Sequence, residues 1–537
     1  MNWEPLGDTA LIFFSHRATP ADRLAESASL AQHLQSFQIP EILDIVSSFD
    51  SVALHFRPLH AGLVREWLTS ALLDPPRQQP LPTSTHEIPT FYDHAELTKI
   101  SALLNLSPNE IIQSHSTAHY TVAALGFSPG FPYLLGLPKK LTLTRLKTPR
   151  PITAGTVAFA AHHAGIYPND SLGGWHPIGK TSFPLFNLAN NPPTPLKPGD
   201  SLRFKPLSSP PQTPTPNLDP PPPTQSPVLQ ITNPGPGTTI QDPGRSGFQH
   251  YGVSRGGSAD RDSAAAANLL VGNPPEAPIL EFCLQGPVLT ALRDTTFAVV
   301  GGPPEVSGTT RSLKMGQSLD LRPNPSAAFG YLAISGGFDV PKILGSHATD
   351  VRAGFGGHQG RPLQTGDLLG QLPPRPAPRL APGQHITWPQ SGLQPQTLLI
   401  RVLPGLQHDL FDDPSQFALL DEHFTKTSRL DRTGARLEGP KLSLASPHNL
   451  TSQPVTLGTI QVPPDGLPIV LQSECQTIGG YPVIAHIIAA DLPLFTRALP
   501  GTQIRFHPVN LDQAAEAFTL RLQELAFLQS ALKLSTP

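Results

Sequence analysis

The chain has 537 residues, a formal net charge of −3, only 14% charged residues and 65 prolines. This length is too great for one hydrophobic core and predicts several domains, while the proline content favours short strands and tight turns over long helices. The charge balance provides no excess of basic residues to bind nucleic acid, and no apolar stretch reaches the roughly 20 residues of a membrane span. We therefore expect a cytoplasmic protein that binds neither nucleic acid nor a membrane.

Residues 1–85 predict a small α/β domain. Residues 9–14 are a short apolar run typical of a strand, and Thr19-Pro20 supplies an N-cap and a first-turn proline. A helical face follows at Leu24, Ala28, Ala31 and Leu34. Alternation at Val52, Leu54 and Phe56 predicts a half-buried strand, and Leu63, Trp67 and Ala71 begin another helical face. This order requires a sheet with helices on one side.

Residues 86–206 predict a second domain that opens with two short helices. Ser107 to Glu110 forms a capping-box pattern before the second of them. After Tyr120 the sequence changes to short apolar runs and turn residues, with strands predicted at 156–161 and 202–204. We therefore expect a compact β-rich domain.

Residues 207–227 are mostly Pro, Ser, Thr and Gln and predict an extended, semi-rigid linker. Two β-rich halves follow at 228–372 and 396–510, separated by a connector at 373–395. The segment 511–537 predicts a C-terminal amphipathic helix. Its apolar face is expected at Ala515, Phe518, Leu522 and Leu525.

The spelling from Gly174 to Thr181 matches the P-loop pattern G-x-x-x-x-G-K-[ST]. A P-loop must open a helix whose N-terminal amides hold phosphates, yet Pro184 stands where that helix would form. We therefore interpret the match as accidental. Lys180 still offers a point charge for an anion.

A few polar residues are candidates for a site. Asp242 and Arg245 are expected to pair, either in a way that leaves the guanidinium free to bind a carboxylate or phosphate or as an ion pair that only staples their loop. His115 ends a short helix, where a structural cap and a catalytic role are equally supported. The 20 histidines form no metal-binding pattern, and the two cysteines form neither a disulfide framework nor a zinc-type cluster, so we expect no metal.

Several ordered motifs resemble known protein families. Gly126 to Tyr133, Gly165 to Pro168 and Ser171 to Trp175 resemble the B subunit of 5-oxoprolinase, also described as allophanate hydrolase subunit 1 or as a sporulation-kinase inhibitor. Further motifs resemble the C subunit of 5-oxoprolinase, at 239–245, 267–273, 335–338, 458–466 and 476–482. Both modules are also similar to the carboxyltransferase region of urea carboxylase and urea amidolyase.

The sequence departs from the family pattern at four places. Lys180 replaces the usual Arg, Leu172 replaces a Pro, His163-Ala164 replaces Gln-Thr, and Glu474-Cys475 replaces Asp-Arg. The first exchange explains the accidental P-loop spelling. The loss of the family's Arg at position 475, which is a Cys here, suggests an altered preference for substrate charge.

The resemblance implies a mostly β fold with α+β parts, made of cyclophilin-like β-barrel domains and an N-terminal α/β cap domain, with the two β-barrel halves of the C-subunit module at 228–372 and 396–510. It implies a fused B–C component of an ATP-dependent 5-oxoprolinase that opens 5-oxo-L-proline to L-glutamate with a separate A subunit. ATP with Mg²⁺ as its counter-ion is implied, and no covalent biotin, because the Met-Lys-Met attachment spelling is missing. Two alternatives stay open: biotin-dependent carboxyl transfer to urea or a related amide, and a binding module that inhibits a sensor kinase. Whether the chain forms a homo-oligomer also stays open.

The implied chemistry requires positive groups for anionic oxygens and groups that handle protons. We expect Arg245, Lys180 and Arg352 in the first role and Asp242, Glu281 and His115 in the second. Asp242, Arg245, His115 and Glu281 are thus the candidate catalytic residues. The candidate substrate- or nucleotide-binding residues are Tyr133, Tyr167, Trp175, Lys180, Thr181, Gln241, Arg352, Gln476 and Tyr481.

Overall fold

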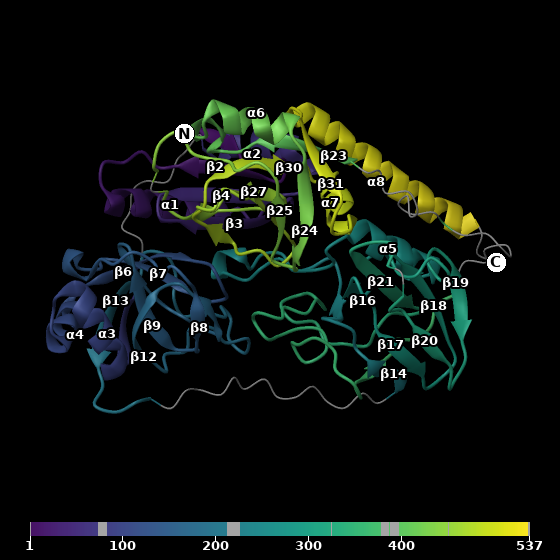
Figure 1. Ribbon diagram of the computed structural model, residues 1–537, viewed down its shortest axis with the longest axis horizontal. Coiled ribbons are helices and arrows are strands. Elements are labelled where there is room, and N and C mark those ends of the chain that lie inside the picture. Colours follow the sequence, from purple (N-terminus) through teal and green to yellow (C-terminus); the bar gives the residue numbers. More distant parts are fainter. Residues whose placement is uncertain are drawn as a thin grey trace.

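The computed structural model describes residues 2–72, 83–211, 226–323, 325–376, 386, 397–448 and 450–534. These residues form an N-terminal α/β domain, two closed β-barrels and a pair of open sheets (Figure 1). The protein is thus mostly β, with two seven-stranded barrels consistent with the cyclophilin-like fold. Most of the linker expected at 207–227 and of the connector expected at 373–395 lies outside the described residues.

The N-terminal domain is a four-stranded antiparallel sheet with two helices. Its elements are β1 (Trp3–Pro5), β2 (Ala10–Phe14), α1 (Pro20–Gln35), β3 (Ile42–Ser48), β4 (Ser51–Phe56), the 3-10 turn η1 (Pro58–His60) and α2 (Ala61–Ala71), with strand order β1-β2-β4-β3. The Thr19 hydroxyl caps α1 as expected, accepting the Asp22 N–H at 3.1 Å. The face predicted for α1 is buried throughout.

Two details of this domain differ from expectation. Strand β4 is buried on both faces rather than half-buried, because α1 and α2 cover one face and Leu406 of the second barrel packs near the other. The buried face of α2 is formed by Val64, Leu68 and Ala71, whereas Leu63 is 57% exposed. The three apolar residues used for the prediction could not tell which of two adjacent faces of the helix would be buried. Packing against the sheet selected the face one position further along.

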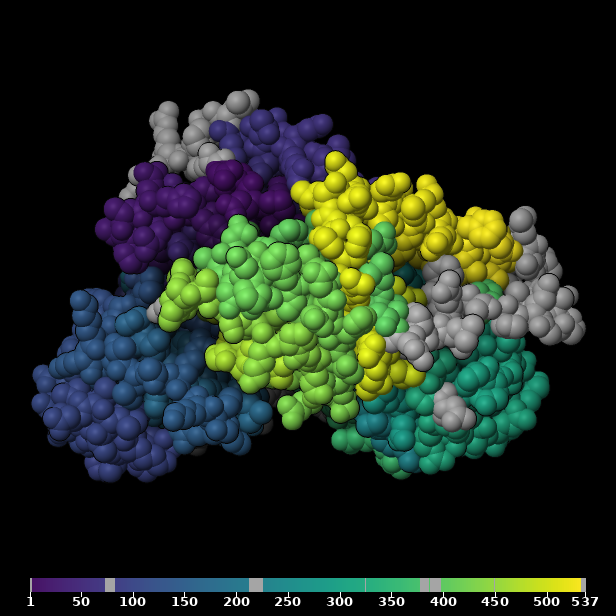
Figure 2. Space-filling model, turned by 45° about the horizontal axis from the view of Figure 1, so that its top comes forward, coloured from purple at the N-terminus to yellow at the C-terminus, as the bar shows by residue number. Residues whose placement is uncertain are grey.

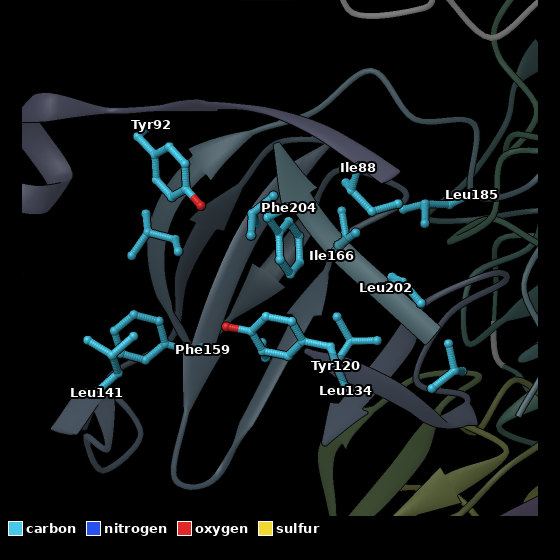
Figure 3. Packing of buried hydrophobic residues seen from close by; sticks show 14 of the residues in the cluster. Ile88, Tyr92, Tyr120, Leu134, Leu141, Phe159, Ile166, Leu185, Leu202 and Phe204 are labelled. Atoms are coloured by element: carbon cyan, nitrogen blue, oxygen red, sulfur yellow. The ribbon is translucent and has the colours of Figure 1, made fainter. Parts of the chain in front are cut away.

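The first barrel closes in the order β10-β7-β6-β13-β5-β12-β9. Its strands are β5 (Thr85–Tyr92), β6 (Tyr120–Leu125), β7 (Pro132–Leu135), β9 (Thr156–Ala160), β10 (His163–Ile166), β12 (His176–Lys180) and β13 (Ser201–Pro206). Helices α3 (His94–Leu104) and α4 (Pro108–Thr117), the 3-10 turn η2 (Lys139–Leu141) and the hairpin β8 (Arg150–Ile152) with β11 (Ser171–Gly173) lie outside this ring. Large apolar side chains fill it (Figure 3).

The expectation that this domain opens with helices is wrong, because β5 precedes α3. The segment begins with three consecutive polar residues, Thr85, His86 and Glu87, and contains Pro89, so the sequence gives a weak local signal for a strand. A parallel partner 116 residues away in sequence, β13, makes it a strand, with Ser201 opposite Thr85. The capping box at Ser107 and Glu110 is confirmed at the start of α4.

Two open sheets follow, where a first barrel half was expected at 228–372. One sheet contains β14 (Pro227–Asn233), β17 (Val288–Ala291), β20 (Ser318–Asp320) and β22 (Leu368–Gly370); the other contains β15 (Thr239–Gln241), β16 (Ile279–Cys283), β18 (Thr295–Val300), β19 (Thr310–Leu313) and β21 (Phe329–Ile334). Apolar residues of both sheets share one core, which makes a sandwich. Strands of barrels and of sandwiches show the same alternation of apolar and polar residues. The two folds differ in whether the edge strands of the sheet pair with each other and close a ring. The helix α5 (Arg261–Leu270) and the 3-10 turn η3 (Gln249–Tyr251) belong to this half.

The second barrel repeats the strand order of the first. Its strands are β23 (Thr397–Pro404), β24 (Phe424–Leu430), β25 (Gly434–Glu438), β27 (Thr459–Gln461), β28 (Ile469–Leu471), β30 (Val483–Ile487) and β31 (Gln503–Pro508). The first barrel can be followed as β5-β12-β9-β10-β7-β6-β13 and the second as β23-β30-β27-β28-β25-β24-β31. In each ring the first and last strands pair in parallel. The two barrels therefore have one topology.

The remaining elements lie around the second barrel. They are the 3-10 turn η4 (His408–Leu410), α6 (Asp413–Asp421), β26 (Gln453–Pro454) with β29 (Ile478–Gly479), α7 (Leu492–Arg497) and α8 (Leu511–Leu534). Figure 1 shows α8 running from this barrel toward α5 of the sandwich. Its buried residues include Ala514, Ala517 and Leu528, whereas Ala515 of the expected face is exposed. Because α8 packs first against the second barrel and then against the sandwich, its buried residues do not all lie on a single face of the helix.

The regions before and after the linker are in direct contact. A Cβ placed on Gly126 would lie 2.7 Å from the Ile478 side chain, and the Gly130 N–H donates to the Tyr251 carbonyl at 2.8 Å. The Asp44 carboxylate contacts His250 Nδ1 at 2.8 Å. The glycines of the 126–133 motif thus permit close approach between the two regions.

Candidate active site

A cavity of about 860 Å³ lies where the N-terminal domain and the two barrels meet. In Figure 2 these three parts, purple, blue and light green, adjoin on the same side of the molecule. The first barrel contributes residues of β7 and β10, and the second contributes the loops around 441–452, 462–466 and 480–482. The cavity therefore joins motifs that lie more than 300 residues apart in the sequence.

Aromatic side chains form one wall of this cavity. The Tyr133 ring of β7 lies 5.9 Å from the Trp175 ring and 5.8 Å from Phe49, which belongs to the turn between β3 and β4. Phe49 in turn contacts the His163 ring of β10 at 4.9 Å. These rings pack edge to face, an arrangement that fixes their orientation.

Burial sets the protonation state of this wall. Burial, with help from His162 and Arg145, lowers the pKa of His163 to about 4. Burial raises the pKa of Tyr133 to about 12, although Arg145 opposes the change. At neutral pH the wall therefore presents a neutral imidazole and a protonated phenol, both able to hydrogen-bond without carrying charge.

Two cations from different modules face the same cavity. Arg145 comes from the first barrel domain and Lys441 from the second barrel domain, and both side chains are exposed. Among the described residues neither has an ion-pair partner. Arg23 and Asp50 of the N-terminal domain complete the rim, and burial raises the pKa of Asp50. Unpaired cations beside neutral hydrogen-bonding groups suit an anionic ligand.

The structure brings three of the predicted site residues to this cavity: Tyr133, Trp175 and Tyr481. Tyr167 lies behind them, where it is 2% exposed and its pKa is raised to about 12 by burial, although a backbone hydrogen bond from Trp175 opposes the rise. It positions the Trp175 segment and does not line the cavity. Gln476 is half-buried and does not line it either.

His115 lies inside the first barrel, away from the cavity. Its Nδ1 is 2.8 Å from the Tyr92 hydroxyl, and its ring packs on Tyr120 and Phe204. Burial lowers its pKa to about 3. The expected proton-handling role has no geometric support, because a neutral core histidine reaches no ligand. Figure 3 shows the three aromatic partners inside the barrel.

Lys180 and Thr181 occupy the end of a strand, not a phosphate loop. Strand β12 pairs with β9 and β5 up to Lys180, and the Thr181 N–H donates to the Gly155 carbonyl at 2.8 Å. Thr181 is 2% exposed, while Lys180 is exposed and lines no part of the cavity. No helix begins at this point of the described chain.

Asp242 and Arg245 do not pair, although both alternatives for them expected a pair. The Asp242 carboxylate instead accepts the Ser346 hydroxyl and the His347 N–H, each at 2.6 Å. Arg245 is 1% exposed and donates to the Ala348 carbonyl at 2.5 Å, with its guanidinium over the Phe355 ring. Both side chains hold the 346–355 loop, so the structure supports a structural role for them.

Glu281 belongs to a buried network. It accepts the Tyr331 hydroxyl at 2.8 Å and pairs with Arg432 of the second barrel. The Arg432 guanidinium also contacts Glu474 at 2.6 Å. This network joins the sandwich to the second barrel and includes Glu474, one of the positions that depart from the family pattern.

The remaining two predicted residues are also structural. Gln241 is fully buried and donates to the Thr239 hydroxyl at 2.9 Å. Arg352 is exposed, and its guanidinium lies 5.5 Å from the Phe127 ring centre, so it links the sandwich region to the 126–133 motif. Neither faces the cavity.

Sequence reasoning missed the cations of the site. Arg145 and Lys441 belong to no glycine-rich motif. Among the cavity residues missed by the sequence prediction, only His163 had stood out in the sequence, because it departs from the family pattern. In the part of the chain that the structure describes, no group of three or more His, Cys, Asp or Glu could hold a metal ion. No helix among the described residues is long and apolar enough to span a membrane.

Two closed barrels of one topology, with a shared cavity between them, define a two-module protein of the carboxyltransferase-like class. The chain matches the family models "Carboxyltransferase domain, subdomain C and D" over residues 1–196 and "Carboxyltransferase domain, subdomain A and B" over residues 251–508. The C and D subdomains thus precede A and B in this chain.

Individual relatives match the two modules separately. The second module is 35% identical to the 5-oxoprolinase C subunit of Haemophilus influenzae over 288 residues, 52% of this chain and 90% of the relative. The first is 33% identical to the 5-oxoprolinase B subunit of Escherichia coli O157:H7, over 37% of this chain and 94% of the relative. Urea amidolyase of Saccharomyces cerevisiae is 30% identical over 53% of this chain but only 17% of its own length.

One solved structure covers both modules together. The crystal structure of TTHA0988 superposes with a TM-score of 0.78 and 35% sequence identity, over 93% of this chain and 99% of that one. The chain therefore belongs to the carboxyltransferase-domain family of the 5-oxoprolinase B and C subunits, and its modules are consistent with a fusion of the two.

Proposed function

We propose that this chain is the fused B–C component of a 5-oxoprolinase and opens 5-oxo-L-proline to L-glutamate, with ATP hydrolysis, in complex with a separate A subunit. The observation that carries the proposal is the cavity that both modules build, because neither module alone would supply all of its walls. The relatives of the two modules are named as subunits of one enzyme.

The walls of the cavity suit the chemistry of lactam opening. A lactam carbonyl resists attack by water, and activating it with phosphate creates anionic oxygens. Arg145 and Lys441 are the unpaired cations that would stabilise them. The protonated Tyr133 hydroxyl can donate to the ring carbonyl, and the neutral His163 can accept a proton or hydrogen bond from the ring nitrogen or a water.

The same cations are suited to ATP, which would bring Mg²⁺ as its counter-ion. The cavity volume lies within the range of about 300 to 1,000 Å³ that small-molecule sites occupy. Phosphate oxygens would lie toward Arg145 and Lys441, and the aromatic wall of Tyr133 and Trp175 would take an apolar or planar part of a ligand. Lys180 and Arg245 have no place in this arrangement.

Reconstitution tests the proposal directly. The chain is purified with and without an A-subunit homologue, and glutamate formed from 5-oxoproline and ATP is measured. We expect turnover only in the mixture. Arg145→Gln and Lys441→Gln should each lower kcat/KM about tenfold to a hundredfold, while Arg322→Gln, a surface control, should not. Full activity of the chain without a partner, or none with it, contradicts the proposal.

A second candidate is biotin-dependent carboxyl transfer to urea or a related amide. It is supported by the family models and by the match to urea amidolyase. The same cavity would then receive a carboxylated biotin from another protein. Transfer from free carboxybiotin to urea, measured without ATP, would favour this candidate over the first.

A further inference from the structure

A second cavity, of about 360 Å³, lies away from the one described above. Its walls come from η1 of the N-terminal domain, from α5 of the sandwich half, from the 472–473 and 489–496 segments of the second barrel, and from α8. We call it the arginine cavity, after Arg57, Arg255, Arg261 and Arg521, which line it. None of the four groups proposed above to act in lactam opening lines it: Arg145, Lys441, Tyr133 and His163.

Buried donors without partners point into this cavity. Ser258, Gln472 and Ser473 are 3%, 4% and 6% exposed, and the Ser258 and Ser473 hydroxyls and the Gln472 amide nitrogen have no hydrogen-bond partner among the described residues. The Arg255 Nε and an Arg261 guanidinium nitrogen are also buried without a partner there. Native proteins rarely leave such groups unsatisfied. Five of them in one cavity indicate a missing acceptor.

The cations of the cavity repel one another. Burial lowers the pKa of Arg261 to about 10, with further lowering from Arg521 and Arg57, although Asp242 and Asp262 oppose the change. Burial also lowers the pKa of Arg255 strongly, and Arg261 contributes to that change. Arg261 is also the first residue of α5, where the helix dipole disfavours a positive charge and favours an anion. These placements cost stability in the ligand-free protein, and a bound anion would remove that cost.

The carboxylates of the cavity wall form an ion pair with only one of these four arginines, Arg521. Asp262 is engaged by Arg521 through two contacts of 2.5 Å, and Asp242 is engaged by Ser346 and His347. Glu276 is exposed and has no ion pair among the described residues. Arg57, Arg255 and Arg261 thus remain without a carboxylate partner there.

Another part of the cavity lining is apolar. It consists of Ala264 and Ala265 of α5 and Phe518, Leu522 and Leu525 of α8. From this arrangement we infer that the arginine cavity binds a small organic anion. Its carboxylate or phosphate head is held by Arg255, Arg261, Ser258 and Ser473, and its apolar body lies between α5 and α8. Because three parts of the fold line the cavity, such a ligand would fasten the N-terminal domain to the second module.

Binding is tested on the full chain alone, without any partner or catalytic assay. Calorimetry and thermal unfolding are carried out with hexanoate, hexyl phosphate, inorganic phosphate and hexylamine. We expect saturable binding and a raised Tm with hexanoate or hexyl phosphate, weaker binding of inorganic phosphate, and none of hexylamine. The tighter of the two organic anions identifies the head group.

Variants assign the effect to this cavity. Arg255→Gln and Arg261→Gln should each weaken the anion about tenfold to a hundredfold. Without ligand, Arg261→Gln should melt no lower than the wild type, because its guanidinium makes no hydrogen bond to the described residues that would be lost. If an arginine variant fails to fold, Ser258→Ala with Ser473→Ala is the smaller change and should also weaken binding. Arg322→Gln, an exposed arginine far from α5 in sequence, is the matched control.

Two results would overturn the inference. One is that no anion binds the wild-type chain at millimolar concentration. The other is that the arginine and serine variants bind as tightly as the wild type, which would mean an adventitious ion only. Because neither readout involves 5-oxoproline or a partner protein, failure here leaves the proposed function untouched, and the reverse also holds.

Discussion

The Arg432 guanidinium of the second barrel forms a buried ion pair with the Glu281 carboxylate of the sandwich. The same guanidinium reaches Glu474 and the Gly257 carbonyl, so one side chain closes the contact between two units. Arg432→Met would leave two buried carboxylates without their cation. We expect a loss of about 3 to 5 kcal/mol in the free energy of unfolding, measured by urea denaturation.

Arg436→Ala is the matched control for that change. Arg436 lies four residues away and pairs with Asp465 at the surface, at 3.0 Å. A surface pair of this kind contributes about 0 to 1 kcal/mol. Equal losses in the two variants would show that the buried network contributes no more than an exposed pair.

Gly126 is predicted to be needed for contact between the two modules. An alanine there would place its Cβ 2.7 Å from Ile478 Cδ1 and 2.9 Å from Ile478 Cβ, which cannot move without the backbone. We expect Gly126→Ala to lower Tm and weaken docking. Gly62→Ala, in α2 with no atom within 4 Å of the added Cβ, should be neutral or stabilising by up to about 1 kcal/mol. A Gly126→Ala protein as stable as Gly62→Ala would refute this role.

The two modules should stay together when the linker at 207–227 is cut at an engineered protease site. The contacts of Asp44 with His250 and of Asp8 with the Ala489 N–H cross between the modules, as do the apolar contacts of Ile478. The linker then serves as a tether that raises effective concentration. Co-elution on size exclusion at micromolar concentration is the expected result, and separate peaks would contradict it.

Because His115 is buried in its neutral form, we expect the free energy of unfolding to fall in acid. Its pKa is lowered from 6.5 to about 3 by burial, so between these values the unfolded chain binds a proton that the folded chain does not. The free energy of unfolding therefore falls as pH falls through this window, by about 1.4 kcal/mol per pH unit for this residue. His115→Phe should reduce the measured slope by that amount. The Tyr92 hydroxyl loses its partner at every pH, which shifts the curve without changing the slope.

Lys180→Ala separates the strand interpretation from the P-loop spelling. Because Lys180 ends β12 and lies outside the cavity, we expect ATP binding to the reconstituted complex to change less than about twofold. Lys180→Arg, which restores the usual family residue, should behave alike. Loss of nucleotide binding in a folded Lys180→Ala protein, measured by calorimetry, would restore the P-loop hypothesis.

The sequence alone determined the local features and the family. Thr19 and Ser107 cap their helices as predicted, because capping depends on side chains within one turn. Pro184 and its neighbours exclude a helix after Gly179 for the same local reason. The ordered motifs predicted both modules, and three of the predicted aromatic residues line the cavity: Tyr133, Trp175 and Tyr481.

Tertiary structure decided everything that depends on distant partners. β5 became a strand through its distant partners β12 and β13, and the described strands of 228–372 form two open sheets rather than a closed ring. Arg245 and His115 were predicted in the site but are buried elsewhere, while Arg145 and Lys441, which stand in no motif, meet at the cavity. The burial of a side chain and the charged groups near it are properties of the folded chain, because both depend on residues hundreds of positions away in the sequence.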